Sequence, residues 1–321
     1  MSTDFSRVLR HVMASAAMIC AAAVCTFSSP ALAFEQTMTC YPQTDGRLPA
    51  CSKGEASFPV RWFSPCTTWR THEDFPDELL APLKASFEVW NQVPGSYFRT
   101  YYAGTTDQFG TGYDCAENGA ANQNAVSFLT DWPSSVAGSN VVALTSVTYA
   151  LSDGRIMDAD IRMNGDHFNW EVIDVVSLDL KRVDVQNVMV HEVGHFLGLD
   201  HTLSATYEGN KQASDASMWA QTYPNEIKRR ELDLDDALGL EAAYPLDQAP
   251  NETCTPPDRL THQTSPDWYD PARNQCKSGQ SRRQSQGCCS AAESEPVPLP
   301  LLAATVAGLL FVRLRGQRKL A

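Results

Sequence analysis

Several motifs that would assign a function directly are missing from this sequence. It has no glycine-rich phosphate loop and no Gly-x-Ser-x-Gly turn, which argues against P-loop nucleotide binding and against serine-hydrolase chemistry. Basic residues are in the minority, with 25 Lys and Arg against 38 Asp and Glu, and no basic stripe offsets this excess. The formal net charge of -13 therefore disfavours binding to nucleic acid or to an anionic membrane.

Long apolar runs are also lacking at the C-terminal end, where the apolar stretch covers only residues 299–312. A bilayer-spanning helix needs roughly 20 such residues, so a permanent membrane anchor here would be strained. The N-terminal end is different. Arg7 and Arg10 precede the apolar stretch "VMASAAMICAAAVC", and Ala31-Leu32-Ala33 has the small-residue pattern that signal peptidase cuts. We expect residues 1–33 to be a signal peptide and the mature chain to be exported.

The cysteine content agrees with export. Of the 10 cysteines, Cys20 and Cys25 would leave with the signal peptide, and an even number would remain. In an exported chain this favours disulfides over a cysteine metal cluster. The sequence alone does not fix their connectivity. Proximity favours three pairings: Cys40 with Cys51, Cys66 with Cys115, and Cys254 with Cys276.

The rest of the chain divides by composition, and no internal repeat is present. Residues 34–57 form a short, disulfide-linked N-terminal segment, too short for a folded prodomain. Residues 58–246 have the size and hydrophobic patterning of one domain. Residues 247–290 shift to Pro, Asn, Gln and Ser, which indicates a cysteine-containing linker or a small module. Residues 291–321 form a C-terminal tail.

Within residues 58–246 the apolar pattern predicts a sheet and helices. Residues 77–93 carry apolar side chains at helical spacing, so we expect a helix that lies against the sheet. A second helix is expected from about 185 to 197, with Asp184 as its N-cap. The turn signal at 152–154 makes the last two strands a hairpin. Strands are expected at residues 58–63, 96–102, 124–129, 141–151 and 154–163.

One stretch of the second helix and its continuation, "HEVGHFLGLDH" at residues 191–201, has the composition of a metal site. His191 and His195 are four apart, so on a helix both imidazoles project from one face and can bind one zinc ion. Glu192 can reach a water at an open coordination position and act as a general base. His201 can be the third ligand if the chain turns sharply at Gly198, which tolerates a positive φ.

A chance occurrence of this pattern is expected on the order of 10⁻⁵ times in a chain of this composition. The alternative, that these histidines are satisfied polar groups or a solvated helix end, leaves unexplained why an apolar helix carries them on one face.

The pattern resembles the motif of the metzincin zinc endopeptidases, H-E-x-x-H-x-x-G-x-x-H followed by a methionine-bearing turn. Met218 in "DASMWA" matches that methionine, which in the family supports the metal site from below, although a methionine there is also compatible with ordinary core packing. The stretches "GRIMDADIRMNG", "VDVQNVMVHEVGHFLGLDH" and "LDLDDALGLEAAYP" are most similar to the matrixins within this group.

The resemblance covers roughly residues 58–246 and implies a catalytic domain of the α+β class. In that fold a twisted mixed sheet packs on two main helices, and zinc lies in a cleft between a large upper and a small lower subdomain. A protein or peptide substrate would lie extended along the edge strand of the sheet, within residues 141–150.

Departures from the family pattern limit what can be carried over. Thr202 follows the third histidine, where matrixins commonly have serine. The strand at 141–151 contains no histidine, so a second, structural zinc is not expected. Asp158 and Asp160 offer the hard oxygen ligands that calcium prefers, although such a pair on a strand is also typical of a solvated face.

The family's zinc-capping propeptide cysteine lies in a motif that is absent here. Cys40 or Cys51 could take that role, but a disulfide between them is the favoured interpretation.

The C-terminal tail resembles the sorting tails of myxobacterial surface proteins, in which a cysteine precedes a short apolar stretch and an arginine-rich end. This implies a bacterial source, processing near Cys288 or Cys289, and retention at the cell surface or outer envelope. A plain tail anchor with its basic residues held on the cytoplasmic side is the alternative.

The predicted activity is zinc-dependent hydrolysis of peptide bonds by an exported or surface-attached enzyme. His191, His195 and His201 would hold zinc, and Glu192 would act as general base and then as general acid. Two alternatives share the site: a zinc-bearing adhesion module without hydrolytic activity, and a metal-dependent hydrolase of cell-wall amides. Glu192 favours an enzyme, because a pure binding site needs no base.

Overall fold

Four of the five expected strands assemble into a mixed sheet, together with a strand that begins at Cys66. The computed structural model describes residues 33–44, 46–109, 113, 122–135, 137–175, 177, 179–202, 213–254, 269–270, 275–276 and 281–291, which belong to one unit beginning at Ala33. The expected signal peptide up to residue 32 and the tail from residue 292 lie outside the described residues.

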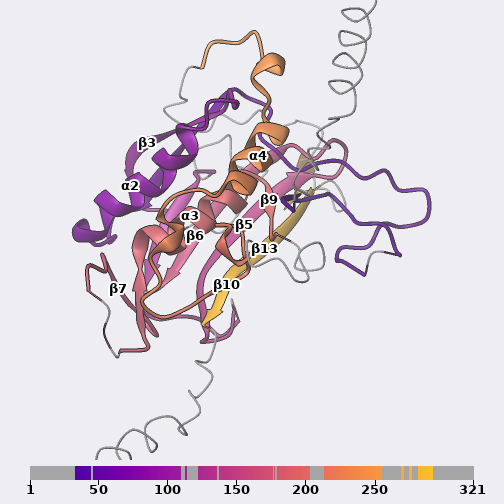
Figure 1. Ribbon diagram of the computed structural model, residues 1–321. Coiled ribbons are helices and arrows are strands. Elements are labelled where there is room, and N and C mark those ends of the chain that lie inside the picture. Colours follow the sequence, from indigo (N-terminus) through magenta and orange to yellow (C-terminus); the bar gives the residue numbers. More distant parts are fainter. Residues whose placement is uncertain are drawn as a thin grey trace, which may run out of the picture. The chain divides into compact units, whose positions relative to one another are not determined.

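Five strands form the main part of the sheet, in the order β5-β6-β4-β2-β3. Strand β2 is parallel to both β3 and β4, β4 is parallel to β6, and β5 is antiparallel to β6. The sheet is therefore mixed, as expected. The strands are β2 (Cys66–His72), β3 (Arg99–Thr106), β4 (Ala125–Leu129), β5 (Val141–Ala150) and β6 (Ile156–Asn164) (Figure 1).

The hairpin between β5 and β6 is confirmed, and Gly154 turns it with a φ of +80°. The strand predicted at residues 58–63 is wrong. This stretch makes only isolated bridges, Pro59 with Met38 and Arg61 with Arg155, and the first long strand begins at Cys66. The physical reason lies in its backbone donors: Pro59 has no N–H to give to a ladder, and the N–H of Trp62 donates instead to the hydroxyl of Tyr244 at 3.0 Å.

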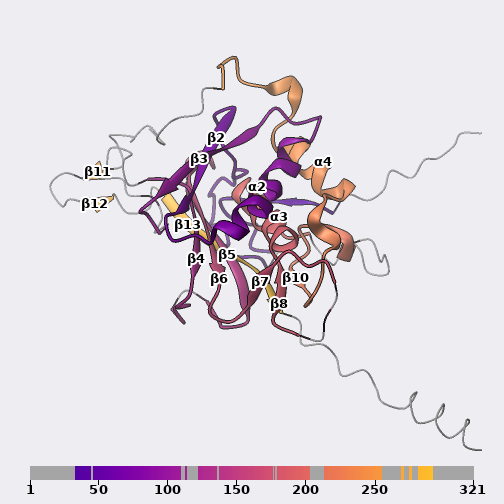
Figure 2. The ribbon, with the colours of Figure 1, turned by 90° about the vertical axis from the view of Figure 1, so that its left-hand side faces the viewer.

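The helices labelled in Figure 2 lie to one side of the sheet. Helix α2 (Asp77–Asn91) and helix α3 (Val185–Phe196) match the two predicted helices, and α4 (Leu234–Ala243) closes the domain. The indole N–H of Trp90 in α2 donates to the carbonyl of Val190 in α3 at 2.9 Å, so the two helices are joined by a buried hydrogen bond as well as by packing.

The core joins sheet and helices through stacked aromatic rings. Trp69 of β2 stacks on Phe87 of α2 with ring centroids 4.0 Å apart, and Phe87 meets Phe196 of α3 edge-on at 5.5 Å. Phe196 also packs against Trp62 at 5.6 Å. Burial of each ring contributes about 2–3 kcal/mol, so this cluster fixes the position of α3 relative to the sheet.

Short elements complete the described chain. Strand β1 pairs with β9, β7 pairs with β8, and β11 pairs with β12. Their bounds are β1 (Glu35–Gln36), β7 (Asn169–Glu171), β8 (Arg182–Asp184), β9 (Leu199–Asp200), β10 (Gln221–Thr222), β11 (Tyr269–Asp270) and β12 (Gln275–Cys276). The 3-10 helices are η2 (Ala213–Asp215), η3 (Lys228–Arg230) and η4 (Leu246–Gln248).

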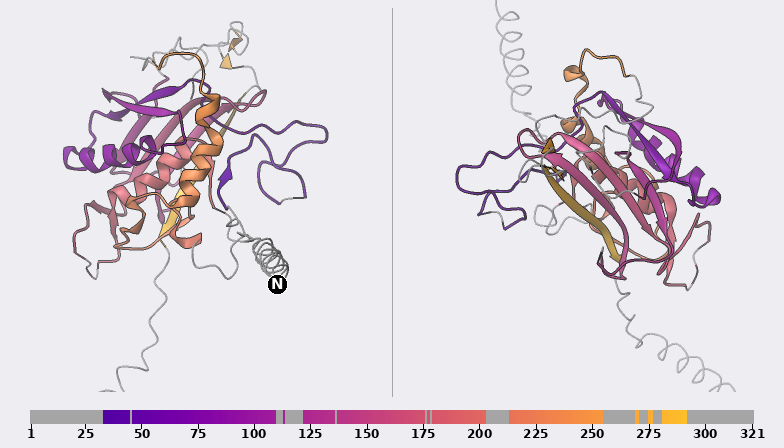
Figure 3. Two further views of the ribbon diagram at one scale, coloured as in Figure 1. Left: turned by 45° about the horizontal axis from the view of Figure 1, so that its top comes forward. Right: turned by 180° about the vertical axis from the view of Figure 1, so that it is seen from behind.

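A long strand near the C-terminus extends the sheet beyond β5. Strand β13 (Ser281–Ala291) runs antiparallel to β5 along its whole length, from Ser281 opposite Ala150 to Ser290 opposite Val141. Its end pairs with β10, which makes a sheet of 7 strands. The right-hand view of Figure 3 shows β13 in yellow beside β5. Strand β5 was expected to be the edge strand that receives substrate; in the structure it is paired on both sides.

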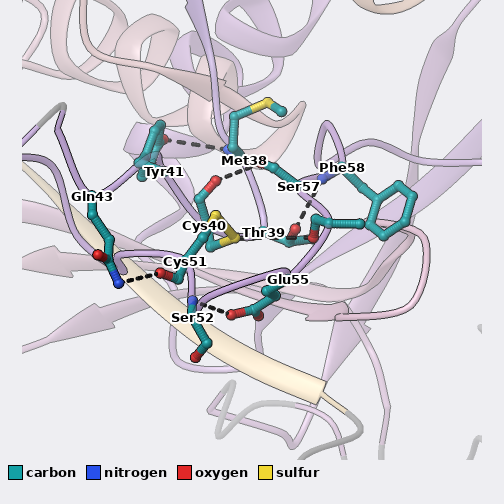
Figure 4. The surroundings of a disulfide bond; sticks show 11 residues. Met38, Thr39, Cys40, Tyr41, Gln43, Cys51, Ser52, Glu55, Ser57 and Phe58 are labelled. Carbon is teal, nitrogen blue, oxygen red and sulfur yellow. Dashed lines mark hydrogen bonds between the residues drawn. A yellow bond between two sulfur atoms is a disulfide. The ribbon is translucent and has the colours of Figure 1, made fainter.

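Two disulfides fasten the ends of the described domain. Cys40 pairs with Cys51, as predicted, in an N-terminal segment where the hydroxyl of Ser57 also donates to the carbonyl of Cys40 at 2.5 Å (Figure 4). Cys66 pairs with Cys254. The predicted pairings of Cys66 with Cys115 and of Cys254 with Cys276 are therefore wrong, because folding brings the start of β2 beside the end of the domain, 188 residues along the chain.

Among the residues that the structure describes, no helix is long and apolar enough to cross a membrane.

Candidate metal centre

Helix α3 carries two of the three expected ligands and the expected base. It begins after Asp184, whose carboxylate accepts a hydrogen bond from the N–H of Asn187 at 2.8 Å, the predicted N-cap arrangement. His191 and His195 lie one turn apart on one face, with ring centroids 4.6 Å apart. Both imidazoles and the side chain of Glu192 between them are buried.

The chain reverses direction at Gly198, directly after the helix. Gly198 has a φ of +91°, and a Cβ atom at this position would lie 2.2 Å from the carbonyl oxygen of Val60. Its N–H donates to the carbonyl of His195 at 2.9 Å. Only glycine satisfies both the positive φ and the close approach. The chain then enters β9, which is labelled in Figure 1. His201 follows β9 and returns to the helix, with its Nε2 3.1 Å from Nε2 of His195.

The three imidazoles converge on one point. One ring nitrogen from each of His191, His195 and His201 lies within 4.8 Å of the others, and the Nε2 atoms of His195 and His201 are 3.1 Å apart. Within the described part of the chain, no other group of three or more His, Cys, Asp or Glu side chains comes close enough to hold a metal ion. The ligand triad inferred from the spacing is therefore assembled by the fold.

Hydrogen bonds to the far side of two rings show which nitrogen faces the centre. Nδ1 of His191 lies 2.6 Å from the carbonyl oxygen of Ser217, and Nδ1 of His195 lies 2.9 Å from that of Leu199. A carbonyl only accepts, so each Nδ1 carries the proton and each Nε2 presents its lone pair.

The chemistry of this donor set fits zinc. Nε2 of His191 is buried and has no hydrogen-bond partner among the described residues, which would cost free energy unless an ion took its lone pair. Three neutral imidazoles are a common ligand set for catalytic zinc, and a fourth position is left to water or substrate. Backbone carbonyls behind the rings are the usual outer partners that hold such ligands.

The electrostatics of the site keep the imidazoles neutral. Burial, followed by the neighbouring imidazoles, holds the pKa of His191 and of His195 well below the usual value. Burial also lowers the pKa of His201, against a smaller opposing effect of the Asp200 carboxylate. Neutral imidazole is the form that binds zinc, so the fold prepares the ligands for metal before the metal binds.

Met218 lies directly beneath the helix that carries the ligands. A Cβ atom on Gly194, between the two histidines of α3, would lie 2.1 Å from Sδ of Met218. The carbonyl of Met218 accepts the N–H of Thr202 at 3.0 Å, which ties the turn to the residue after His201. The buried carboxylate of Asp236 at the start of α4 accepts the N–H of Met218 at 3.0 Å. The turn therefore contacts both segments that supply ligands.

The carboxyl group of Glu192 contacts strand β5 of the sheet. The hydroxyl of Thr145 in β5 donates to Oε2 of Glu192, and the same hydroxyl lies 3.1 Å from the carbonyl oxygen of Glu192. The side chains of Thr145 and Glu192 are fully buried. The base candidate is thus held by the strand that borders the helix.

Sequence reasoning missed four residues that shape this centre: Gly194, Thr145, Ser217 and Asp236. Gly194 lies inside a helix, where glycine is less stable than alanine. A glycine at such a position indicates that another group packs too closely for a side chain, and this signal could have identified it. The other three act from distant parts of the chain, and no local pattern marks them.

The remaining candidates lie outside the triad. Asp158 and Asp160 are on β6, both with buried carboxylates, and Oδ1 of Asp160 accepts the N–H of Ala125 at 3.0 Å. Calcium at this pair stays a prediction.

A comparison with protein families matches residues 144–245 to the matrixin model. The match begins within β5 and contains β6, α3, α4, all three histidines and Met218. Residues 144–245 are a matrixin domain. The chain thus carries a matrixin metalloprotease domain with its histidine triad, and the mixed sheet packed against helices is the matrixin type of α+β fold. A comparison of the chain with curated proteins finds no match.

Strands β2, β3 and β4 and helix α2 precede the residues matched to the matrixin model. They nevertheless pack on the matrixin domain, through the aromatic cluster of Trp69, Phe87 and Phe196. The two disulfides and the matrixin domain together indicate an extracellular protein.

Proposed function

We propose that this protein is an exported zinc endopeptidase in which Glu192 is the general base. The observation that carries the proposal is the convergence of the three histidine nitrogens within 4.8 Å. Glu192 follows the first of these histidines directly in helix α3, and its buried carboxyl group is held by Thr145. A pure metal-binding site has no need of a carboxylate on the residue adjacent to a ligand.

The residues of this chain would divide the work of peptide hydrolysis. His191, His195 and His201 would hold the metal, while the backbone carbonyls of Ser217 and Leu199 fix two of the rings. Zinc, when bound, polarises the scissile carbonyl and lowers the pKa of the attacking water. Glu192 takes the proton from that water and later delivers a proton to the leaving amine. No covalent intermediate is needed.

The substrate class follows from the matrixin domain: proteins or peptides, bound in extended form. The acidic net charge of -13 gives no support to nucleic acid as a partner.

We also propose the address and attachment of the protein from its sequence. The signal peptide of residues 1–33 would direct export. The tail of residues 291–321 would act as a sorting signal, with processing near Cys288 or Cys289 and retention of the protein at a bacterial cell surface. Calcium at Asp158 and Asp160 is a further expectation. Elemental analysis of the purified protein would report calcium alongside zinc.

The test of the activity is hydrolysis of a mixed, internally quenched peptide library by the full chain, compared with Glu192→Gln. The amide keeps the size of the side chain but cannot act as a base. We expect both proteins to bind one zinc ion and hydrolysis to fall by a factor of roughly 10²–10⁴ in the variant. Glu88→Gln, at an exposed glutamate on α2, is the matched control and should retain full activity.

A zinc-loaded wild type that cleaves no peptide would favour the adhesion module or the cell-wall amide hydrolase. Retained hydrolysis in zinc-loaded Glu192→Gln would remove Glu192 from the mechanism.

A further inference from the structure

The hydroxyl of Thr145 is placed where it can orient the base of the proposed mechanism. Thr145 lies in the middle of β5, opposite Ile161 of β6, and its side chain points toward α3. Its hydroxyl reaches both the carboxylate and the carbonyl oxygen of Glu192, and neither side chain is exposed to solvent.

We propose that Thr145 is a positioning residue for Glu192. The inference rests on the proposed function, because it matters for catalysis only if Glu192 is the base. A carboxylate that accepts a hydrogen bond at one oxygen loses rotational freedom, so its direction relative to the metal site is fixed before substrate arrives. The hydroxyl provides this hydrogen bond from a strand rather than from a mobile loop.

Packing alone does not explain a threonine here. Valine has the same branched shape and suits a buried strand equally well, whereas a buried hydroxyl without a partner costs about 1–3 kcal/mol. The same strand offers a comparison. Thr148 is also buried, but its hydroxyl has no hydrogen-bond partner in the described part of the chain.

The experiment compares Thr145→Val, Thr145→Ser and Thr148→Val in the full chain, with a cleavable peptide as substrate. We expect Thr145→Val to keep its zinc and its KM while kcat falls roughly 10–100-fold, the range seen when outer hydrogen-bond partners of such sites are removed. Thr145→Ser should restore most of kcat, and Thr148→Val should match the wild type. If Thr145→Val does not fold, Thr145→Ala against Thr145→Ser repeats the comparison of hydroxyl with no hydroxyl.

Equal kcat values for Thr145→Val and Thr148→Val would overturn the inference. So would an equal loss in Thr145→Ser and Thr145→Val, since volume rather than the hydroxyl would then be responsible. In both cases the proposed function is still supported if Glu192→Gln does not hydrolyse the peptide. If Glu192→Gln does hydrolyse it, the proposed function is itself contradicted.

A second, independent observation concerns the strand that pairs with β5. An extended peptide can add to a sheet only where a strand has an unpaired edge. The edge of β5 that faces away from β6 is taken by β13, which runs antiparallel to β5 over its whole length. Gln286 of β13 lies opposite Thr145, the residue that contacts Glu192.

We infer that Ser281–Ala291 is a built-in occupant of the peptide-binding edge and keeps the enzyme latent until it is displaced. This inference also rests on the proposed function. The Cys66–Cys254 disulfide ties Cys254 to the start of β2, and β13 belongs to the same chain, so the strand competes with substrate at a high effective concentration. The hydroxyl of Tyr149 donates to the side chain of Gln284 at 3.2 Å, which adds a side-chain contact to the backbone pairing.

Proline in β13 tests this inference. Successive N–H groups of a strand point to opposite sides, so one of Gln284→Pro and Ser285→Pro must remove a donor that faces β5. We expect that variant to cleave a small peptide several-fold faster and to show faster amide hydrogen exchange in β5. Asn251→Pro, in the same C-terminal region but outside β13, should change neither.

Faster amide exchange in β5 without faster peptide cleavage would show that β13 does not block a peptide-binding edge that the enzyme uses. Unchanged exchange and unchanged cleavage in both proline variants would overturn the pairing itself. Either result, obtained while Glu192→Gln remains inactive, leaves the proposed function intact.

Discussion

Gly194 and Met218 are in direct contact: the space where a Cβ of Gly194 would lie is filled by the sulfur atom of Met218, 2.1 Å from that position. The glycine lies between His191 and His195 on α3, so the methionine-bearing turn presses against the one part of the helix that both ligands share. This contact sets the distance between the helix that carries the two histidines and the turn that carries Met218.

Gly194→Ala is expected to destabilise the protein although alanine is the better helix former. The added methyl group meets Met218 and, at 3.1 Å, the ring of Trp90, and overpacking of this kind costs about 1–3 kcal/mol. Urea denaturation of the zinc-loaded protein would measure it, and zinc affinity should fall as the helix moves. Gly95→Ala is the control, because its neighbour is the flexible end of Glu241. A stabilised Gly194→Ala would show that Met218 yields without cost.

Substitution at Gly198 should remove the third ligand from the site. Gly198→Ala and Gly198→Asn both place a Cβ against the backbone carbonyl of Val60. Asparagine tolerates a positive φ better than alanine does, but this tolerance does not relieve the clash, so we expect both variants to be impaired. We expect a loss of at least about 1–2 kcal/mol in the free energy of unfolding and weaker zinc binding in each. Calorimetric zinc titration would check this. Wild-type zinc affinity in the asparagine variant would contradict it.

The pH dependence of stability in the zinc-free protein should follow the buried histidines. Their folded pKa values are lowered, so below about pH 6.5 the unfolded chain binds protons that the folded chain does not. The free energy of unfolding should therefore decrease as the pH falls from 7.5 to 5.5. His191→Gln should flatten this decrease by about 1 kcal/mol in chelator-treated protein.

Asp236 acts in the opposite direction in the same range. Burial raises the pKa of its carboxyl group to about 6, so the folded protein takes up this proton first and gains stability as the pH falls. Because Asp236 is present in both proteins, its effect cancels in the difference between wild type and His191→Gln. An identical pH slope for the two proteins would show that His191 is protonated in the folded state.

The two disulfides should contribute unequally to stability. The Cys66–Cys254 bond closes a loop with a sequence separation of 188 residues, and the Cys40–Cys51 bond one of only 11. Removing the long link as Cys66→Ser with Cys254→Ser should cost about 4–5 kcal/mol, against about 3 kcal/mol or less for Cys40→Ser with Cys51→Ser. Urea denaturation of the two double variants would compare them. A smaller loss for the long link would mean that the unfolded chain keeps residues 66 and 254 together.

The sequence predicted the histidine triad and the fold class because both depend on the spacing of residues that lie close together in the chain. Histidines four apart fall on one helix face, Asp184 caps the helix it precedes, and Gly198 marks the turn. The motifs on which the family resemblance was based lie mainly within residues 144–245, the stretch that matches the matrixin model. Helices α2 and α3 and four of the five strands could be predicted for the same reason.

The predictions that were wrong concern residues whose structure is determined by contacts with distant parts of the chain. Residues 58–63 have strand-like composition, but Trp62 gives its backbone N–H to Tyr244 and its indole N–H to Phe196 instead of to a neighbouring strand. The pairing of Cys66 with Cys254 likewise joins residues that only folding brings together. Proximity along the chain carries no information about such pairs.

The sequence by itself determined which histidines form the triad, which neighbouring residue is the candidate base, and which helix carries two of the histidines, since periodicity and turn chemistry act within a few residues. Only the tertiary structure decided what surrounds them: the carbonyl of Ser217 behind His191, the hydroxyl of Thr145 on Glu192, and the strand Ser281–Ala291 along β5. These contacts join segments far apart in the chain, and their geometry arises when the apolar faces of the sheet and helices pack together and bring the polar groups with them.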